Sequence, residues 1–209
     1  MVLVSPDPHA DLDPSYAALL PALRRMGLLT ESQPFTLTPL TGGVSSLIVR
    51  VDTADQQFCV KRALPQLKVS ARWEAPVTRN RDEVAWLAYA QRIVPQAVPP
   101  LLGEDAQDCV FAMAYLPAEQ FPVWKQQLMQ GNIHPQTAQQ VAQTLVTLHA
   151  ASARDQALLN RFDHDDDFVA IRLSPYFLHT AEKHAECAAA LHALVQQTLS
   201  HKRVLIHGD

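Results

Sequence analysis

The chain has 209 residues, of which 48% are hydrophobic and 18% charged, as is ordinary for a globular protein. Its net charge of -4 and isoelectric point near 6.1 argue against a nucleic-acid partner, which would favour a basic surplus. The cysteines Cys59, Cys109 and Cys187 are far apart and odd in number, which argues against a disulfide framework and a cysteine-based metal site. Neither a signal peptide nor an apolar run of the roughly 18 residues of a membrane span is evident, so we expect a cytoplasmic protein with no membrane partner.

The N-terminal part predicts one helix and then an antiparallel meander of strands. Pro14 favours a helix start and Gly27 a helix end. An apolar stripe between them would form the buried face: Leu19, Leu20, Leu23 and Met26. Three β-rich runs with short connections follow, and they predict strands at 35–40, 47–51 and 57–63.

The composition changes near residue 117, from a β-rich to a helix-rich pattern. Before the change we expect a helix at 80–93 and strands at 98–102 and 109–115. After it we expect helices at 122–130, 136–151 and 176–200 and a short strand at 203–206. The second of these helices would bury Ala138, Val141, Ala142, Leu145 and Leu148. We therefore predict an α+β fold with a β-rich lobe over 1–116 and a helical lobe over 117–209.

A paired-glycine loop joins the first two predicted strands. It consists of Gly42, Gly43, Val44, Ser45 and Ser46. Glycines let the backbone approach a ligand closely and turn its amides toward an anion. A plain hairpin turn is the alternative interpretation, since the loop is neither a Walker motif nor a full GxGxxG.

Lys61 lies in an apolar stretch of the third predicted strand. An inward ammonium would need a partner, and Glu83, early in the next helix, is the natural one. Such a pair is how kinases hold a lysine against nucleotide phosphates. Glu74 and Asp82 are possible substitutes, and a solvent-facing lysine is the alternative.

Two charged stretches are further candidates. One is basic and suits a polyanion such as a nucleotide, although a solvated face is the alternative: Lys61, Arg62, Lys68, Arg72, Arg79 and Arg81. The other is the acidic run 163–167, which suits a cation or a cationic substrate, although such runs are usually solvated loops or helix starts. The tryptophans at 73, 86 and 124 are expected in the core or between the lobes.

The sequence His207-Gly208-Asp209 follows the last predicted strand. An aspartate in this position suits a general base that accepts the proton of a substrate hydroxyl. The alternative is a polar chain end in which Gly208 makes a turn.

Taken in chain order, these segments resemble the aminoglycoside-phosphotransferase family, a branch of the kinase-like fold that includes methylthioribose kinase and choline kinase. The stretch 60–81 is similar to the methylthioribose-kinase side of the family. The segments that carry the resemblance are 40–46 for the phosphate loop, 59–61 for the lysine strand, 79–83 for the glutamate helix, 111–116 for the hinge strand, 145–149 for a helix end and 204–209 for the catalytic loop.

The resemblance implies a two-lobed, protein-kinase-like fold and an ATP-dependent phosphotransferase that acts on a hydroxyl of a small molecule. It implies ATP and Mg²⁺ as cofactors and Asp209 as the catalytic base. The residues that it assigns to the nucleotide are Gly42, Gly43, Val44, Ser45, Ser46, Lys61, Glu83, Met113 and Tyr115.

Two departures from the family pattern bear on this expectation. Ala114 replaces an acidic hinge residue, which matters little because adenine is read mainly by backbone. The family also places an asparagine about five residues after the catalytic aspartate, and a second acidic residue beyond, to hold Mg²⁺. The sequence ends at Asp209, so we assign no metal ligand and expect this polypeptide to turn over poorly or not at all.

Two alternatives remain at the level of sequence. A non-catalytic nucleotide-binding or scaffold module, a truncated pseudokinase, would bind nucleotide without phosphoryl transfer. A plain α+β domain would have a solvent-facing Lys61 without contact to Glu83. The substrate and the oligomeric state are not predicted.

Overall fold

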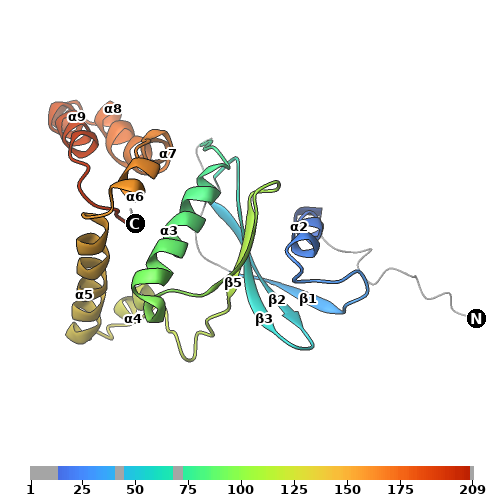
Figure 1. Cartoon of the computed structure of the whole chain (residues 1–209). Coiled ribbons are helices and arrows are strands. Elements are labelled where there is room, and N and C mark those ends of the chain that lie inside the picture. Colours follow the sequence, from blue (N-terminus) through green and yellow to red (C-terminus); the bar gives the residue numbers. More distant parts are fainter. Residues whose placement is uncertain (1–13, 41–44, 68–72, 208–209) are drawn as a thin grey trace, which may run out of the picture.

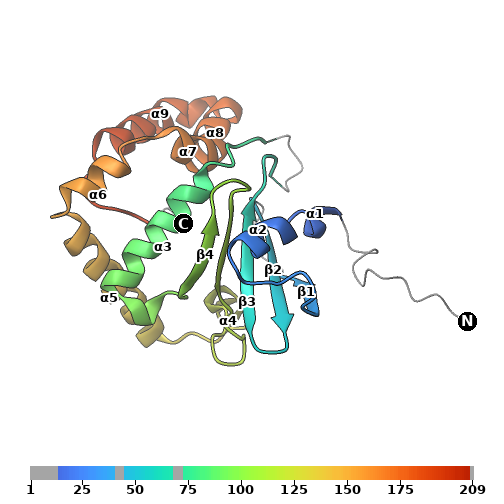
Figure 2. The same cartoon turned by 45° about the vertical axis from the view of Figure 1, so that its right-hand side comes forward.

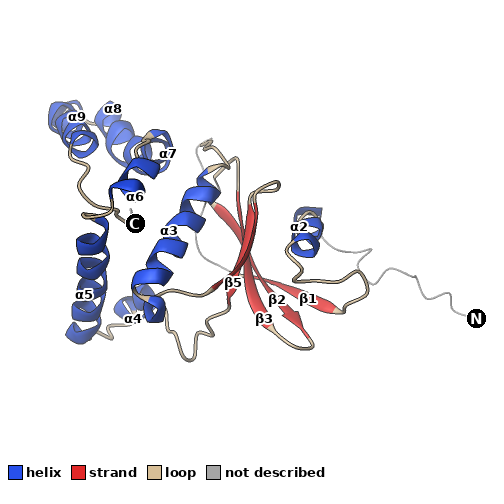
Figure 3. Cartoon of the chain, in the orientation of Figure 1, coloured by secondary structure: helices blue, strands red, loops and turns tan. Residues whose placement is uncertain are grey.

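The computed structural model describes residues 14–40, 45–67 and 73–207, and its centre is an antiparallel sheet. The five strands lie in the order β1-β2-β3-β5-β4. Figure 3 shows the sheet in red. They are β1 (Phe35–Pro39), β2 (Ser46–Thr53), β3 (Gln57–Ala63), β4 (Leu101–Asp105) and β5 (Val110–Ala114). The predicted meander is confirmed, while β4 begins after Pro99 and Pro100 because proline has no amide hydrogen for the ladder.

Two short helices cover one face of the sheet (Figure 2). They are α1 (Pro14–Ala17) and α2 (Leu20–Arg25), where a single helix was predicted. The helix is interrupted because Pro21 has no amide hydrogen and its ring clashes with the carbonyl four residues earlier. Gly27 then ends α2 in the left-handed conformation, with φ of 70°, as predicted.

The main core lies between α2 and the sheet. Leu23 from α2 is fully buried against β2 and β3, where Val51, Phe58 and Val60 are also fully buried. Arg25 fastens the end of α2 to β4, since its Nε and Nη2 atoms donate to the two carboxylate oxygens of Asp105 at 3.1 and 2.6 Å. These hydrogen bonds lower the pKa of the Asp105 carboxyl below its usual range.

A long helix, α3 (Arg79–Ile93), lies between the sheet and the helical half of the chain (Figure 1). Side chains alternate across a strand, so Val60 points to α2 and its neighbour Lys61 points to the opposite face, where α3 runs. Toward its end α3 packs on the helical half, where Tyr89, Ala90 and Leu148 form a second buried cluster. The 3-10 turn η1 (Pro95–Ala97) leads on to β4.

Beyond residue 116 the described chain contains helices and connecting segments. The helices are α4 (Trp124–Met129), α5 (Pro135–Ser152), α6 (Gln156–Arg161), α7 (Asp166–Phe168), the π-helix η2 (Val169–Leu178), α8 (His179–Lys183) and α9 (Ala185–Ser200). The observed α+β class agrees with the prediction, and the division of lobes at residue 116 stays a prediction. Within the described residues, no helix meets the length and apolarity needed to cross a bilayer.

Three predictions in this half differ from the structure. The helix predicted at 176–200 is π-helical at its start, where Pro175 cannot donate a regular helical hydrogen bond, and it breaks at His184 with φ of -131°. Residues 203–206 form no strand, because the amide of Leu205 donates to the hydroxyl of Ser152, at 3.0 Å, rather than to a neighbouring strand.

The predicted buried face of α5 is largely exposed, which is the third difference. Leu148 is buried, but Val141 is 39% exposed, and both Ala138 and Ala142 are exposed. The buried cluster shared with α3 includes Leu148 near the C-terminal end of α5, so the earlier apolar residues have no such cover in the described structure.

Candidate active site

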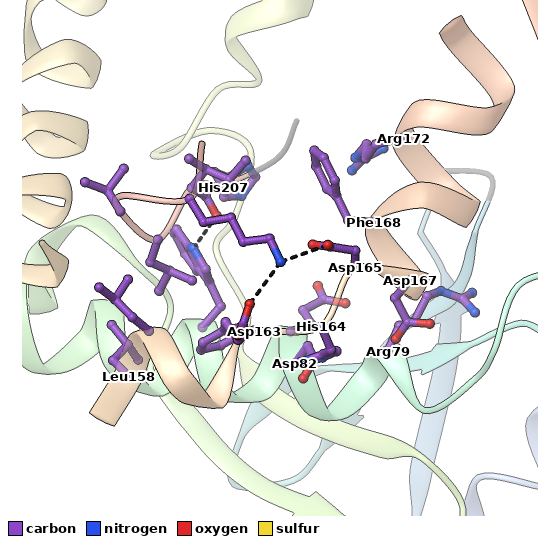
Figure 4. Close-up of a pocket in the computed structure, with 18 of the residues that line it drawn as sticks. Arg79, Asp82, Leu158, Asp163, His164, Asp165, Asp167, Phe168, Arg172 and His207 are labelled. Atoms are coloured by element: carbon purple, nitrogen blue, oxygen red, sulfur yellow. Dashed lines mark hydrogen bonds and ion pairs between the residues drawn. The ribbon is translucent and has the colours of Figure 1, made fainter. Parts of the chain in front are cut away.

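One large cavity lies between the sheet, α3 and the segments around α6, α7 and residues 199–207 (Figure 4). Its volume is about 920 Å³. Of the predicted nucleotide residues that the structure describes, four line it: Ser45, Ser46, Lys61 and Glu83. The cavity therefore brings together the end of the glycine loop, the strand lysine and the helix glutamate.

Lys61 and Glu83 form an ion pair inside this cavity. β3 presents Lys61 toward α3, and Glu83 comes from the second turn of that helix. The Lys61 side chain is only 19% exposed, so its ammonium is largely withdrawn from water, and it is held by the carboxylate of Glu83. The plain-domain alternative, with no contact between these residues, is wrong, and the substitute Asp82 pairs with His164 instead.

The two serines anchor the end of the glycine loop. Ser46 opens β2 and is 8% exposed, and the carbonyl of Ser45 accepts the amide of Leu64 at 3.0 Å. Gly42, Gly43 and Val44 lie outside the described residues, so their contact with phosphates stays a prediction.

Contacts with α3 hold Ile206 and His207, which lead into the predicted catalytic loop. The indole Nε1 of Trp86 donates to the carbonyl of Ile206 at 3.0 Å, and its ring meets that of His207 edge-on at 4.8 Å. Trp86 follows Glu83 by one turn, so α3 carries both the partner of Lys61 and the support of His207. Gly208 and Asp209 lie outside the described residues, and the role of Asp209 stays a prediction.

The two hinge residues lie elsewhere. Met113 sits within β5, paired with Cys59 of β3 and Leu101 of β4. Tyr115 directly follows the strand, and the guanidinium of Arg50 lies 5.2 Å from the centre of its ring. Neither residue lines the large cavity, so the structure does not place them with Lys61 and Glu83.

Residues of the acidic run 163–167 line the cavity beside Asp82 of α3 (Figure 4). Lys202 donates to Asp163 at 2.9 Å and bridges to Asp165 at 2.8 Å. His164 contacts Asp82 of α3 at 2.7 Å, between Nε2 and Oδ2. The contacts of Lys202 are ion pairs within the protein, and that of His164 is one when its ring is protonated. The predicted cation-binding role of the run is untested. We did not predict His164 and Lys202 as cavity residues from the sequence. The feature that could have indicated His164 is its position among carboxylates in the sequence.

The His164–Asp82 pair predicts a pH-dependent contact between α3 and the segment before α7. The hydrogen bond that His164 donates to the carboxylate of Asp82 raises the pKa of His164 above its ordinary value of 6.5, with a smaller contribution from the carboxylate of Asp167. A raised folded pKa means that the pair stabilises fully below pH 6.5, and that this stabilisation is lost as the pH rises through the folded pKa. An NMR titration of the His164 ring is expected to show this higher pKa, and Asp82→Asn is expected to lower it. A pKa at or below 6.5 in the unmodified chain would contradict the structure.

No magnesium ligands are assigned from the structure. Among the residues that it describes, no group of three or more His, Cys, Asp or Glu side chains is arranged to hold a metal ion. The pair of Lys61 with Glu83 fits the expected nucleotide cofactor, because a largely buried, carboxylate-oriented ammonium matches a polyphosphate.

Comparison with known proteins shows to which family this chain belongs. The model of the phosphotransferase enzyme family matches residues 36–209, which is most of the chain. The chain belongs to the phosphotransferase enzyme family. The predicted resemblance is therefore confirmed, and with it a kinase-like α+β fold.

Among curated proteins, this family member is similar to methylthioribose kinases of Yersinia. It is 26% identical to that of Yersinia pseudotuberculosis serotype O:1b (strain IP 31758), over 89% of this chain and 52% of the relative. It is 25% identical to that of Yersinia pestis (strain Pestoides F), with the same coverage. The chain thus spans about half the length of these relatives.

Proposed function

We propose that this protein is an ATP-dependent phosphotransferase that acts on a hydroxyl of a small molecule. The observation that carries the proposal is the Lys61–Glu83 ion pair at the wall of the large cavity, in a chain of the phosphotransferase enzyme family. In kinase-like sites such a lysine contacts the nucleotide phosphates, and the glutamate fixes its direction.

Each side chain has a defined task in this proposal. Lys61 holds the nucleotide phosphates, Glu83 keeps its ammonium in place, and the glycine loop, residues 42–46, is assigned to the phosphate oxygens. Met113 and Tyr115 present backbone groups to the adenine. Bound ATP supplies the phosphoryl group, and magnesium, which the family implies, has no assigned ligand in the described structure.

The chemical step assigned to this chain is a proton transfer. As the substrate hydroxyl oxygen bonds to the γ-phosphorus and the bond to the ADP oxygen breaks, the carboxylate of Asp209 accepts the hydroxyl proton. Trp86 would support this step indirectly, because it holds the backbone of Ile206 and the ring of His207 just before Asp209.

The substrate is proposed to enter the large cavity. Its volume of about 920 Å³ lies within the range of small-molecule sites, roughly 300–1,000 Å³. The names of the Yersinia relatives make methylthioribose the first compound to test.

The test is ADP formation from ATP in the presence of Mg²⁺, with and without methylthioribose and a panel of small hydroxyl compounds. Asp209→Asn should reduce substrate-dependent ADP formation by about 100-fold or more, because it removes the base while keeping the shape. Equal rates in Asp209→Asn would contradict the role of Asp209. Nucleotide binding without transfer to any compound would agree with the poor turnover expected from the sequence and with a non-catalytic nucleotide-binding module, and it would contradict an active phosphotransferase.

A further inference from the structure

Arg79 places its guanidinium among four backbone carbonyls. Its Nη1 atom donates to Ala75 at 3.1 Å and to Pro76 at 2.6 Å, and its Nη2 atom donates to Ser45 at 2.6 Å and to Leu64 at 2.8 Å. Arg79 is only 8% exposed although it is the first residue of α3. A planar guanidinium with donors in a fixed fork is suited to satisfy several acceptors at once.

The four carbonyls belong to three segments, and one of their residues, Ser45, lines the cavity together with Arg79. Ser45 directly precedes β2, Leu64 directly follows β3, and residues 75–76 lead into α3. The carbonyl of Ser45 also accepts the amide of Leu64 at 3.0 Å, so one oxygen joins the two strand ends and Arg79. These contacts fix the spacing between β2, β3 and the start of α3.

The same segments carry the Lys61–Glu83 pair. Lys61 lies three residues before Leu64, and Glu83 lies one turn after Arg79 on α3. A loosened Arg79 would therefore change the distance between the backbone of Ser45 and the ammonium of Lys61. Burial lowers the pKa of Arg79, and the carboxylates of Asp167 and Glu83 oppose this shift.

We propose that Arg79 is a positioning residue for phosphate binding, which rests on the proposed function. It holds the backbone at Ser45 and the Lys61–Glu83 pair in one arrangement, so that both face the nucleotide phosphates together. Its guanidinium acts through backbone carbonyls, and Lys61 makes the phosphate contact.

The test compares ATP and adenosine affinities by calorimetry for the whole chain and for Arg79→Met and Arg79→Lys. The expected result is ATP binding weakened about tenfold, the effect of one lost charged hydrogen bond, with adenosine binding unchanged. Arg79→Lys should not rescue, because a single ammonium cannot reach all four carbonyls. Where Arg79→Met does not fold, Arg79→Lys carries the test. Arg92→Met is the matched control, since Arg92 lies at the far end of the same helix with its side chain 65% exposed.

The outcomes separate this proposal from the proposed function. Unchanged ATP affinity in a folded Arg79→Lys, or equal losses for ATP and adenosine, would overturn the positioning role of Arg79 while leaving the nucleotide site in place. A folded, unmodified chain that binds neither ligand would overturn the proposed function, and the role of Arg79 with it.

Discussion

Replacing Lys61 by methionine is expected to weaken ATP binding by about 10- to 100-fold, the range for losing a charged hydrogen bond. The change removes the ammonium that would meet the phosphates. It also leaves the Glu83 carboxylate without its partner, so that a negative charge faces the phosphate site. Titration calorimetry with ATP and Mg²⁺ measures the effect directly.

The control for this experiment is Lys125→Met. Lys125 is exposed on α4 and does not line the cavity, so the change removes the same charge at a different place. ATP affinity is expected to stay unchanged in this variant. Equal affinities for Lys61→Met and the unmodified chain, both folded, would contradict the assignment of Lys61 to the phosphates.

Leu23→Ala is expected to destabilise the fold by about 2–5 kcal/mol, as for other buried leucines cut back to alanine. Leu23 is fully buried between α2 and the sheet. Its neighbours Phe58 and Val60 are also fully buried, and their packing limits how far the structure can close the cavity that Leu23→Ala would leave. Urea unfolding followed by circular dichroism gives the free energy of unfolding. The result would show that α2 belongs to the same folded unit as the strand that carries Lys61.

Leu128→Ala serves as the matched substitution for this measurement. Leu128 lies on α4 and is 43% exposed, so its truncation is expected to change the free energy of unfolding by about 0.5 kcal/mol or less. A loss for Leu23→Ala as small as that for Leu128→Ala would mean that α2 does not pack on the sheet as described.

The strands and α3 were predictable from sequence because local patterns specify them. Alternating apolar residues bounded by polar turns mark β2 and β3, and they also place Lys61 on the face opposite Val60. The helical half was less predictable. An apolar stripe such as that of α5 indicates a face able to pack, but the position of a partner decides which residues are buried, and Val141 stays exposed.

The candidate site could be predicted only where the type of a residue itself indicates its role. A lysine in an apolar strand and a glutamate at the start of the next helix form a recognisable pair, and their contact is present. The contacts of Arg79 with Ser45 and of His164 with Asp82 join positions distant in sequence, and no local pattern specifies them. Sequence alone therefore indicated the ion pair and named Arg79, Ser45 and Asp82 as candidates, but it did not indicate the contacts that these residues make.

The most direct test of the central claim is a structure of this chain bound to a non-hydrolysable ATP analogue. We expect the phosphates to lie within hydrogen-bond distance of the Lys61 ammonium, with Glu83 still paired to it and Ser45 at the phosphate end of the site. A nucleotide bound away from Lys61 would contradict the account, because the ion pair in the cavity would then serve the fold rather than phosphoryl transfer.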